Sequence, residues 1–384
     1  MNMKGGAVRR LGVALTTTSA GAFPVFLTSA LILQISADLR FPIEKLGFAV
    51  GVYFAAGAAT SALMGRLAEY AGAAAALRMG GVLSSFCLIS IALVGDFSGL
   101  VACLFLGGVC NALCQPAANL YVTRAITRSR RGLALALKQS AIPAATLLGG
   151  VAVPLIALTI GWRWAFVISA AAAAVTALVV PSLGVARGDR ANSTGDDRAP
   201  RTAMVLLAAT VGFGAAAAGC LASFAVAGAA RIGIADAAAG WLVAAGSALA
   251  IATRVYLGHR ADRRDGGHLW IVTWMLFAGG VGSIGLASSM PAVFVLAVPF
   301  VFTAGWGWPG LFNLAVIARN SAAPGAATGF TQTGTYIGGA LGPMLFGLVA
   351  DRVSWTAAWS LVPVFFTLAT LAAVSARAEL RRAR

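Results

Sequence analysis

The chain has 384 residues, of which 59% are hydrophobic and 10% charged, with a mean hydropathy of +0.87 and a formal net charge of +16. Soluble globular domains contain roughly 45–50% apolar and about 25% charged residues, so this composition excludes a soluble enzyme and a disordered chain. It indicates a membrane protein with enough apolar residues for about a dozen spans of ~20 residues.

The first predicted element is a membrane span that follows three basic residues, Lys4, Arg9 and Arg10. Its apolar run, Leu11 to Ile35, is too long for the core of a secretory signal. Eleven further runs follow. The predicted spans are Leu11–Ser36, Leu46–Ala68, Ala75–Val94, Ser98–Val122, Gly132–Ile160, Trp162–Pro181, Ala203–Ile232, Ala238–Gly258, Leu269–Ser289, Ala292–Ala318, Ala326–Ala350 and Trp355–Ala376.

The longest polar stretch, Gly184–Arg201, divides these spans into two groups of six. It is too polar to pack into a core, so we expect a solvated linker. The predicted organisation is therefore an all-α membrane protein with a six-helix bundle over residues 1–183, a linker over 184–202 and a second six-helix bundle over 203–384.

Basic residues are distributed unequally between the two sides of the predicted membrane. The side of the N-terminus collects 21 lysines and arginines, the other side has five, and only Lys138 and Arg254 fall inside spans. Basic residues accumulate in cytoplasmic loops, so both termini and the linker are predicted to be cytoplasmic. This pattern explains the net charge without a compact basic domain, and no nucleic-acid partner is expected.

The five cysteines all lie within apolar stretches. Cys110 and Cys114 are one helical turn apart, but His259 and His268 are remote from them and no metal-binding spacing occurs. We interpret these cysteines as packing residues and predict no metal and no cofactor.

The two groups of spans are related by an internal repeat. A constant shift of 193 residues pairs several unlike features without a gap: Gly65 with Gly258, Pro116 with Pro309, Gly132 with Gly325, Gln139 with Gln332, Gly149 with Gly342, and Trp162 with Trp355. Two parallel six-helix copies are the architecture of a large class of secondary transporters.

Two loop motifs carry a resemblance to a known family. Residues 65–72 read Gly-Arg-Leu-Ala-Glu-Tyr-Ala-Gly with a delayed basic residue, Arg78, and residues 258–264 read Gly-His-Arg-Ala-Asp-Arg-Arg. Both are similar to the Gly-x-Leu-Ala-Asp-x-x-Gly signature of major facilitator superfamily transporters, although Glu69 replaces the aspartate in the first copy. The segment Gly161–Phe166 is also similar to a segment of that family.

The resemblance implies two six-helix bundles that alternate between facing states, with the two loops as gates. A small glycine would let helix ends approach, and the carboxylate would cap a helix or pair with arginine. The alternative is a loop that only obeys the positive-inside rule. The predicted gating residues are Gly65, Glu69, Arg78, Arg254, Gly258, Asp262 and Arg263; for Arg254, snorkelling to the interface or pairing with the motif carboxylates is expected.

Polar side chains inside spans are the candidates for a binding site, because they are costly in lipid. The predicted substrate-binding residues are Lys138, Gln139, Asn111, Gln115, Gln332, Tyr336 and Asn313. Lys138 either faces a cavity or snorkels to the interface. The amides of Asn111, Gln115 and Asn119 bind a ligand or join helices. Trp306 and Trp308 are interpreted as a cavity wall rather than an interfacial belt.

Two further sequence patterns concern helix packing and the charge of the transported solute. Gly334, Gly338 and Gly342 form a small-residue stripe that predicts close helix packing and no chemistry. All twelve acidic residues lie in loops or at span ends, and Gly149-Gly150 stands where drug antiporters of the family have Gly-Pro. A pump for cationic drugs is therefore disfavoured, and Lys138 favours a neutral or anionic solute.

We therefore predict a monomeric secondary transporter of a bacterial cytoplasmic membrane, whose partners are the lipid bilayer, a small-molecule solute and a coupling proton or ion. An exporter of a drug or secondary metabolite is the alternative. A membrane enzyme would need clustered His, Asp or Glu, which the sequence lacks, and a non-transporting receptor of this fold is rarely so repeat-symmetric. No Gly-x-x-x-x-Gly-Lys-Ser/Thr loop occurs, so an ion or solute gradient, as in a symporter, is the expected energy source.

Overall fold

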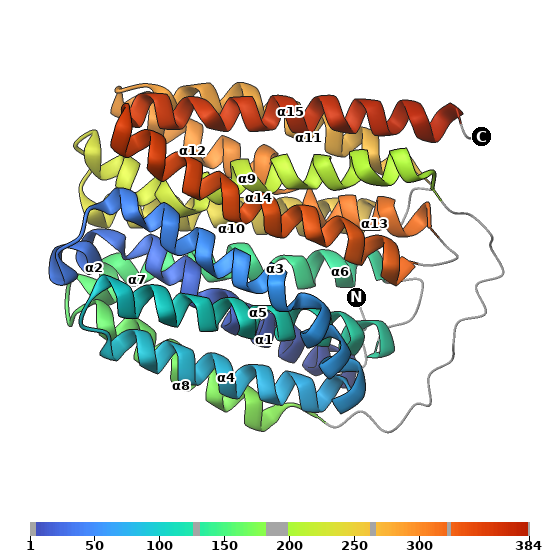
Figure 1. Cartoon of the computed structure of the whole chain (residues 1–384), viewed down its shortest axis with the longest axis horizontal. Helices are drawn as coiled ribbons and strands as arrows, with labels where there is room; N and C mark the ends of the chain where they lie inside the picture. Colours follow the sequence, from blue (N-terminus) through green and yellow to red (C-terminus); the bar gives the residue numbers. More distant parts are fainter. Residues whose placement is uncertain (1–4, 126–130, 182–198, 262–265, 321–323, 383–384) are drawn as a thin grey trace.

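The computed structural model describes residues 5–125, 131–181, 199–261, 266–320 and 324–382, and every regular element in these ranges is a helix (Figure 1). The first half contains α1 (Gly5–Ala30), α2 (Ile32–Leu39), η1 (Ile43–Lys45), α3 (Leu46–Ala71), α4 (Ala73–Leu93), α5 (Phe97–Ala125), α6 (Arg131–Gln139), α7 (Ala141–Ala152), the π-helical turn η3 (Val153–Ala157) and α8 (Trp162–Val179). The second half contains α9 (Arg201–Arg231), α10 (Asp236–Ala261), α11 (His268–Ser283), η4 (Ile284–Ala287), α12 (Pro291–Trp306), α13 (Pro309–Ala318), α14 (Pro324–Arg352) and α15 (Trp355–Arg382).

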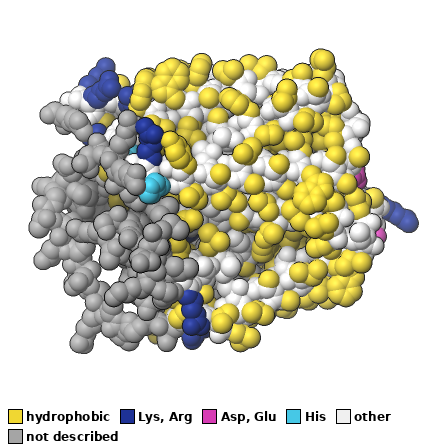
Figure 2. All heavy atoms as spheres, turned by 180° about the vertical axis from the view of Figure 1, so that it is seen from behind, with side chains coloured by type: hydrophobic (Ala, Val, Ile, Leu, Met, Phe, Trp, Pro, Cys, Tyr) yellow, Lys and Arg dark blue, Asp and Glu magenta, His cyan; other side chains and the backbone are white. Residues whose placement is uncertain are grey.

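Twelve helical segments of the described chain are long and apolar enough to cross a membrane. This number confirms the count expected from the sequence. An α-helix satisfies all its interior backbone hydrogen bonds within the segment, which is why lipid selects it. On the face shown in Figure 2, hydrophobic side chains cover the middle of the molecule and charged side chains lie towards its two ends.

The first predicted span, Leu11–Ser36, is interrupted at Leu31 between α1 and α2, and the fifth and tenth spans are interrupted as well. The fifth span is divided at Ser140 between α6 and α7, and the tenth is divided at Gly307 and Trp308 between α12 and α13. Pro143 and Pro309 follow these breaks closely. Proline has no backbone N–H, so the carbonyl four residues earlier, that of Gln139 or Gly305, loses its helical donor.

The elements of the first and second halves gather on two sides of the molecule in Figure 1, with α1 to α8 on one side and α9 to α15 on the other. Across the division, α3 packs against α14, while α6 and α7 pack against α10. Both chain ends lie at the same end of the helices, which we call the terminal end (Figure 1). The other end, which carries Asp38, Glu44 and Arg231, is called the opposite end.

Close contacts between helices depend on glycine at two places. On α14, a Cβ atom at Gly334, Gly338 or Gly342 would overlap the backbone of α9, which confirms the predicted packing role of this stripe. Between the halves, a Cβ atom on Gly150 of α7 would lie 2.6 Å from the carbonyl oxygen of Gly240 of α10, and the reverse distance is also 2.6 Å. Glycine therefore sets how closely the two halves approach near the opposite end.

Candidate functional site

A cavity of about 90 Å³ lies between the two halves. The first half contributes Gln115 from α5, Gln139 from α6 and Ile142 from α7, and the second half contributes residues of α9, α10, α12, α13 and α14. Its polar lining consists of Gln115, Gln139, Arg254, Asn313, Gln332 and Thr335, and its aromatic lining consists of Trp306, Trp308 and Phe312. Four predicted binding residues and the predicted tryptophan wall thus meet around one space.

Lys138 lies behind the amide wall of this cavity. Its side chain is 2% exposed, and Nζ donates hydrogen bonds to Oε1 of Gln115 and, at 3.4 Å, to Oε1 of Gln139. Gln115 in turn donates from Nε2 to Oδ1 of Asn111 at 3.3 Å. Both of its amide partners line the cavity, so the ammonium group lies next to this space with the two amides between them.

Arg254 occupies a different environment from the one expected. The sequence suggests the membrane interface or the motif carboxylates, but the side chain is 2% exposed and lines the cavity. Nε and Nη2 donate to the carbonyl oxygen of Trp306 at 3.1 and 2.6 Å, and Nη1 donates to the carbonyl oxygen of Gln139. The guanidinium also lies over the Trp306 ring, 5.6 Å from its centroid.

The helix breaks explain why these carbonyls accept hydrogen bonds from a side chain. Pro143 removes the helical donor for Gln139, and Trp306 is the last residue of α12, where carbonyls have no partner within the helix. The neighbouring Gly305 carbonyl, opposite Pro309, accepts from Nε1 of Trp308 at 2.7 Å. Arg254 therefore connects the two halves through backbone atoms that the prolines and the helix end leave available.

No carboxylate neutralises this region among the described residues. The ion pairs of the described chain are Arg163 with Asp38, Arg231 with Glu44 and Arg382 with Glu379. All of these pairs lie at the ends of the helices. A buried ammonium and a buried guanidinium thus adjoin the cavity with only amide, carbonyl and aromatic partners, and such a space is favourable for an anion.

The remaining predicted binding residues, Tyr336 and Asn111, lie outside the cavity lining. Tyr336 is 4% exposed and packs beside Gly57, where a Cβ atom would lie 3.0 Å from Cε1 of the tyrosine. Asn119, at the third position of the amide stripe, is exposed. The stripe on α5 therefore divides into a part next to the cavity and a part away from it.

The predicted gating loops make few contacts in this conformation. A Cβ atom on Gly65 would meet no atom within 4 Å, so close approach of helix ends at this glycine is not seen in this conformation and stays a prediction. Glu69 is exposed and belongs to no ion pair of the described chain, while Arg78 donates to the Val180 carbonyl at 2.8 Å. Gly258 is buried on α10, and Asp262 and Arg263 lie outside the described residues.

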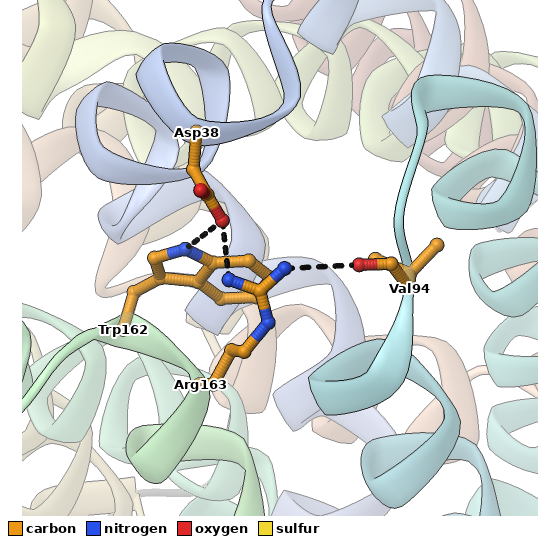
Figure 3. Close-up of polar contacts among 4 residues, drawn as sticks. All are labelled: Asp38, Val94, Trp162 and Arg163. Atoms are coloured by element: carbon orange, nitrogen blue, oxygen red, sulfur yellow. Dashed lines mark hydrogen bonds and ion pairs between the residues drawn. The ribbon is translucent and has the colours of Figure 1, made fainter.

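Polar contacts that the sequence does not reveal lie at the opposite end. In the Asp38 cluster, Asp38 accepts hydrogen bonds from Nε1 of Trp162 at 3.1 Å and from Arg163, which also donates to the Val94 carbonyl at 3.1 Å (Figure 3). The guanidinium of Arg163 lies 4.4 Å from the centroid of the Trp162 ring. The hydrogen bond from Arg163, followed by that from Trp162, lowers the pKa of the Asp38 carboxyl below its ordinary value.

A second cluster joins the two halves at this end. In the Glu44 cluster, Oε1 of Glu44 accepts from Arg231 and from Nε1 of Trp355, each at 2.9 Å, and Arg231 lies 4.8 Å from the centroid of the Trp355 ring. Gln34 of α2 also donates to Asp236 of α10 at 3.0 Å. The internal repeat gives a sequence signal for these clusters. The shift of 193 residues that pairs Trp162 with Trp355 also pairs Asp38 with Arg231.

Comparison with known protein families gives a match over the first half of the chain and the start of the second. The sequence profile of a family described as the Major Facilitator Superfamily matches residues 11–230, more than half of the chain. A search among curated proteins finds no match to this sequence. The matched segment extends from the start of the first predicted span to the end of α9 and thus includes Lys138, Gln139 and the Asp38 cluster.

Proposed function

The chain belongs to the Major Facilitator Superfamily, a family of membrane transporters and not of enzymes, and from this membership we propose that it moves a small neutral or anionic organic solute across the cytoplasmic membrane. We further propose that transport follows alternating access, as a symporter coupled to a proton or ion. A carboxylate is the favoured cargo.

The observation that carries the proposal is the pair of cations beside the central cavity. Lys138 and Arg254 are each 2% exposed, and no carboxylate of the described chain pairs with either. Buried charges in membrane proteins face partners or a pathway, because an unpaired charge is costly in lipid. An anionic solute would supply the missing negative charge, and the amides of Gln139, Gln332 and Asn313 would orient its polar atoms.

The size of the cavity favours a small solute. Its volume of about 90 Å³ is well below the roughly 300–1,000 Å³ of pockets that bind drug-sized ligands. The aromatic wall of Trp306, Trp308 and Phe312 would pack against the carbon skeleton of the solute. This wall is also the observation that supports the alternative, an exporter of a drug or secondary metabolite.

Alternating access is supported by contacts between the halves on two sides of the cavity. At the opposite end, Glu44 contacts Arg231 and Gln34 contacts Asp236; towards the terminal end, Arg254 contacts the carbonyl of Gln139. A solute could leave in either direction only after one of these sets separates. We therefore assign this conformation to an occluded step of the cycle.

The proposal is tested by uptake and counterflow of labelled carboxylates in proteoliposomes. Lys138→Ala should weaken the apparent affinity for an anionic substrate about ten-fold to one-hundred-fold, since it removes a hydrogen bond to a charged group worth roughly 1.5–3 kcal/mol. Lys138→Arg should retain part of the anion preference. The matched control is Arg352→Ala, because Arg352 is an exposed cation at the end of α14, outside the cavity and outside both predicted gating loops.

Two outcomes would contradict the anion assignment. In the first, Lys138→Ala transports with its rate and its anion preference intact. In the second, the purified protein exchanges no carboxylate, while a deletion strain becomes sensitive to members of a panel of toxic compounds. The second outcome would support the exporter.

A further inference from the structure

A second cavity, of about 330 Å³, lies at the terminal end between α9, α11, α13 and α15. We call it the basic pocket, and its polar side chains are His268, Arg319, Arg377 and Arg381. Arg319 follows the last residue of α13, Arg377 and Arg381 lie one turn apart on α15, and His268 is the first residue of α11. Neither the transport cavity nor the predicted gates include any of these residues.

The charged side chains among the described lining residues of the basic pocket are all basic. They are three guanidinium groups, and the imidazole of His268 lies beside them as a further polar group. Its floor includes Gly266 and Gly267, which have positive φ angles of 90° and 77° and lead directly into the N-terminus of α11. The partial positive charge of that 16-residue helix adds to that of the arginines.

An exposed row of aromatic rings begins at this pocket and follows α11. Trp270, which lines the pocket, and Trp274 and Phe277 are 46%, 53% and 51% exposed, and successive rings meet edge to face at 5.4 and 5.7 Å. Positions 270, 274 and 277 share one helix face. The guanidinium of Arg377 lies 4.1 Å from the centroid of the Trp270 ring, so the charged pocket and the aromatic row are continuous.

We infer that the basic pocket binds the phosphate headgroup of an anionic phospholipid from the leaflet at the terminal end, with an acyl chain along Trp270, Trp274 and Phe277. Guanidinium groups match phosphate oxygens through paired N–H donors. Basic pockets between membrane helices bind anionic headgroups in this manner. The continuous exposed aromatic row favours a lipid over a free phosphate ion, because it offers an acyl chain an apolar surface that begins at the charged pocket.

The test uses the full chain, purified in detergent and depleted of lipid. Native mass spectrometry and thermal unfolding would be followed during titration with phosphatidylglycerol, phosphatidylcholine or inorganic phosphate. We expect bound phosphatidylglycerol and a raised Tm, with little effect of the other two. Each of Arg377→Gln and Arg381→Gln should weaken phosphatidylglycerol binding roughly five-fold, from about 1 kcal/mol per basic residue near a charged membrane surface.

Two matched variants test the contributions of the lipid headgroup and of the acyl chain separately. Arg260→Gln removes an exposed arginine that lies outside the pocket near the same end of α10, and it should leave binding unchanged. Trp274→Ala should weaken phosphatidylglycerol binding without changing the response to inorganic phosphate.

Equal binding of phosphatidylglycerol and phosphatidylcholine, or equal effects of Arg377→Gln and Arg260→Gln, would overturn the inference. Full competition by inorganic phosphate together with an inert Trp274→Ala would assign the pocket to a free anion instead. Gel filtration of each variant establishes that it is folded.

Discussion

At the scale of single residues, Arg254 shows how a buried cation is accommodated without an acid. Its planar guanidinium donates to carbonyl oxygens in both halves, Gln139 in one and Trp306 in the other. A lysine could not serve both positions with the same geometry, because its ammonium is a compact point charge. The charge remains uncancelled, while the hydrogen-bonding groups are satisfied.

The Asp38 cluster leads to a prediction about pH. The lowered pKa of Asp38 means that its carboxylate contributes to stability above the ordinary value of 3.8, and that this contribution is lost as the pH falls through the lower value of the folded state. Since the side chains of Arg163 and Asp38 are 42% and 45% exposed, we expect Asp38→Asn to cost less than about 1 kcal/mol at neutral pH. Thermal unfolding of both proteins from pH 7 to pH 3 checks this.

The difference in Tm between wild type and Asp38→Asn should persist at pH 5 and shrink below pH 4, around the ~3.9 of an unperturbed aspartate. A difference that is already lost at pH 6 would contradict the assignment to Asp38. The control is the same comparison in an Arg163→Gln background, where the pair is absent and the difference should be small.

Several site residues could be predicted from the sequence because a charge or amide inside a span has few alternatives. This reasoning placed Gln139, Gln332 and Asn313 near one another, and the structure brings them to one cavity. It could not place Arg254, because the carbonyls that bind it become available only when two helices break. Nor could it foresee Glu44 with Arg231, since their contact depends on how the halves approach each other.

At the scale of helices, the breaks in the fifth and tenth spans shape the cavity. Gln139 ends α6 and Trp306 ends α12, so two broken spans, one from each half, meet the same guanidinium. Apolar periodicity predicted both spans correctly but could not locate these breaks. A proline within a membrane helix can bend it, interrupt it or leave it straight, according to what supplies the missing hydrogen bond.

The glycine contact between α7 and α10 yields a prediction for a helix pair. Gly240→Ala would insert a methyl group 2.6 Å from the Gly150 carbonyl oxygen and should force the two helices apart near the opposite end. Overpacking costs about 1–3 kcal/mol, so labelling of a cavity cysteine through that end should rise roughly five-fold to one-hundred-fold. Asn313→Cys in a cysteine-free background, treated with an impermeant maleimide, provides the measurement.

Gly329→Ala is the matched control, because a Cβ atom there meets nothing within 4 Å. If Gly240→Ala and Gly329→Ala are labelled at the same rate, the contact between α7 and α10 does not hold the opposite end closed.

At the scale of the whole molecule, the even number of spans places both chain ends at the terminal end. The excess of basic residues predicts that this end is cytoplasmic. Tyr70, 92% exposed in the last turn of α3, lies at the terminal end, and Val353, 71% exposed between α14 and α15, lies at the opposite end. In intact cells, an impermeant maleimide should label Val353→Cys, and it should label Tyr70→Cys only after lysis. The reverse pattern would invert the topology.

The fold as a whole was more predictable than the site. Lipid permits few structures, so hydropathy alone gave twelve spans, and the described chain has twelve helical segments of spanning length. The repeat predicted two related halves, but the contacts that join those halves do not repeat. Asp38 accepts a hydrogen bond from Trp162, and both residues belong to the first half. The position 193 residues after Asp38 is occupied by Arg231, which is not an acid. Trp355, the counterpart of Trp162, donates instead to Glu44 of the other half.

The shared contact of Glu44 with two helices of the other half has a consequence for how those helices move. A single oxygen of Glu44 accepts from both Arg231 at the end of α9 and Trp355 at the start of α15, and Arg231 also covers the Trp355 ring. When Glu44 withdraws, both helices lose the same partner in one event, yet they keep each other through the cation–π contact. We therefore expect α9 and α15 to lose Glu44 together and to move as one body when this contact opens.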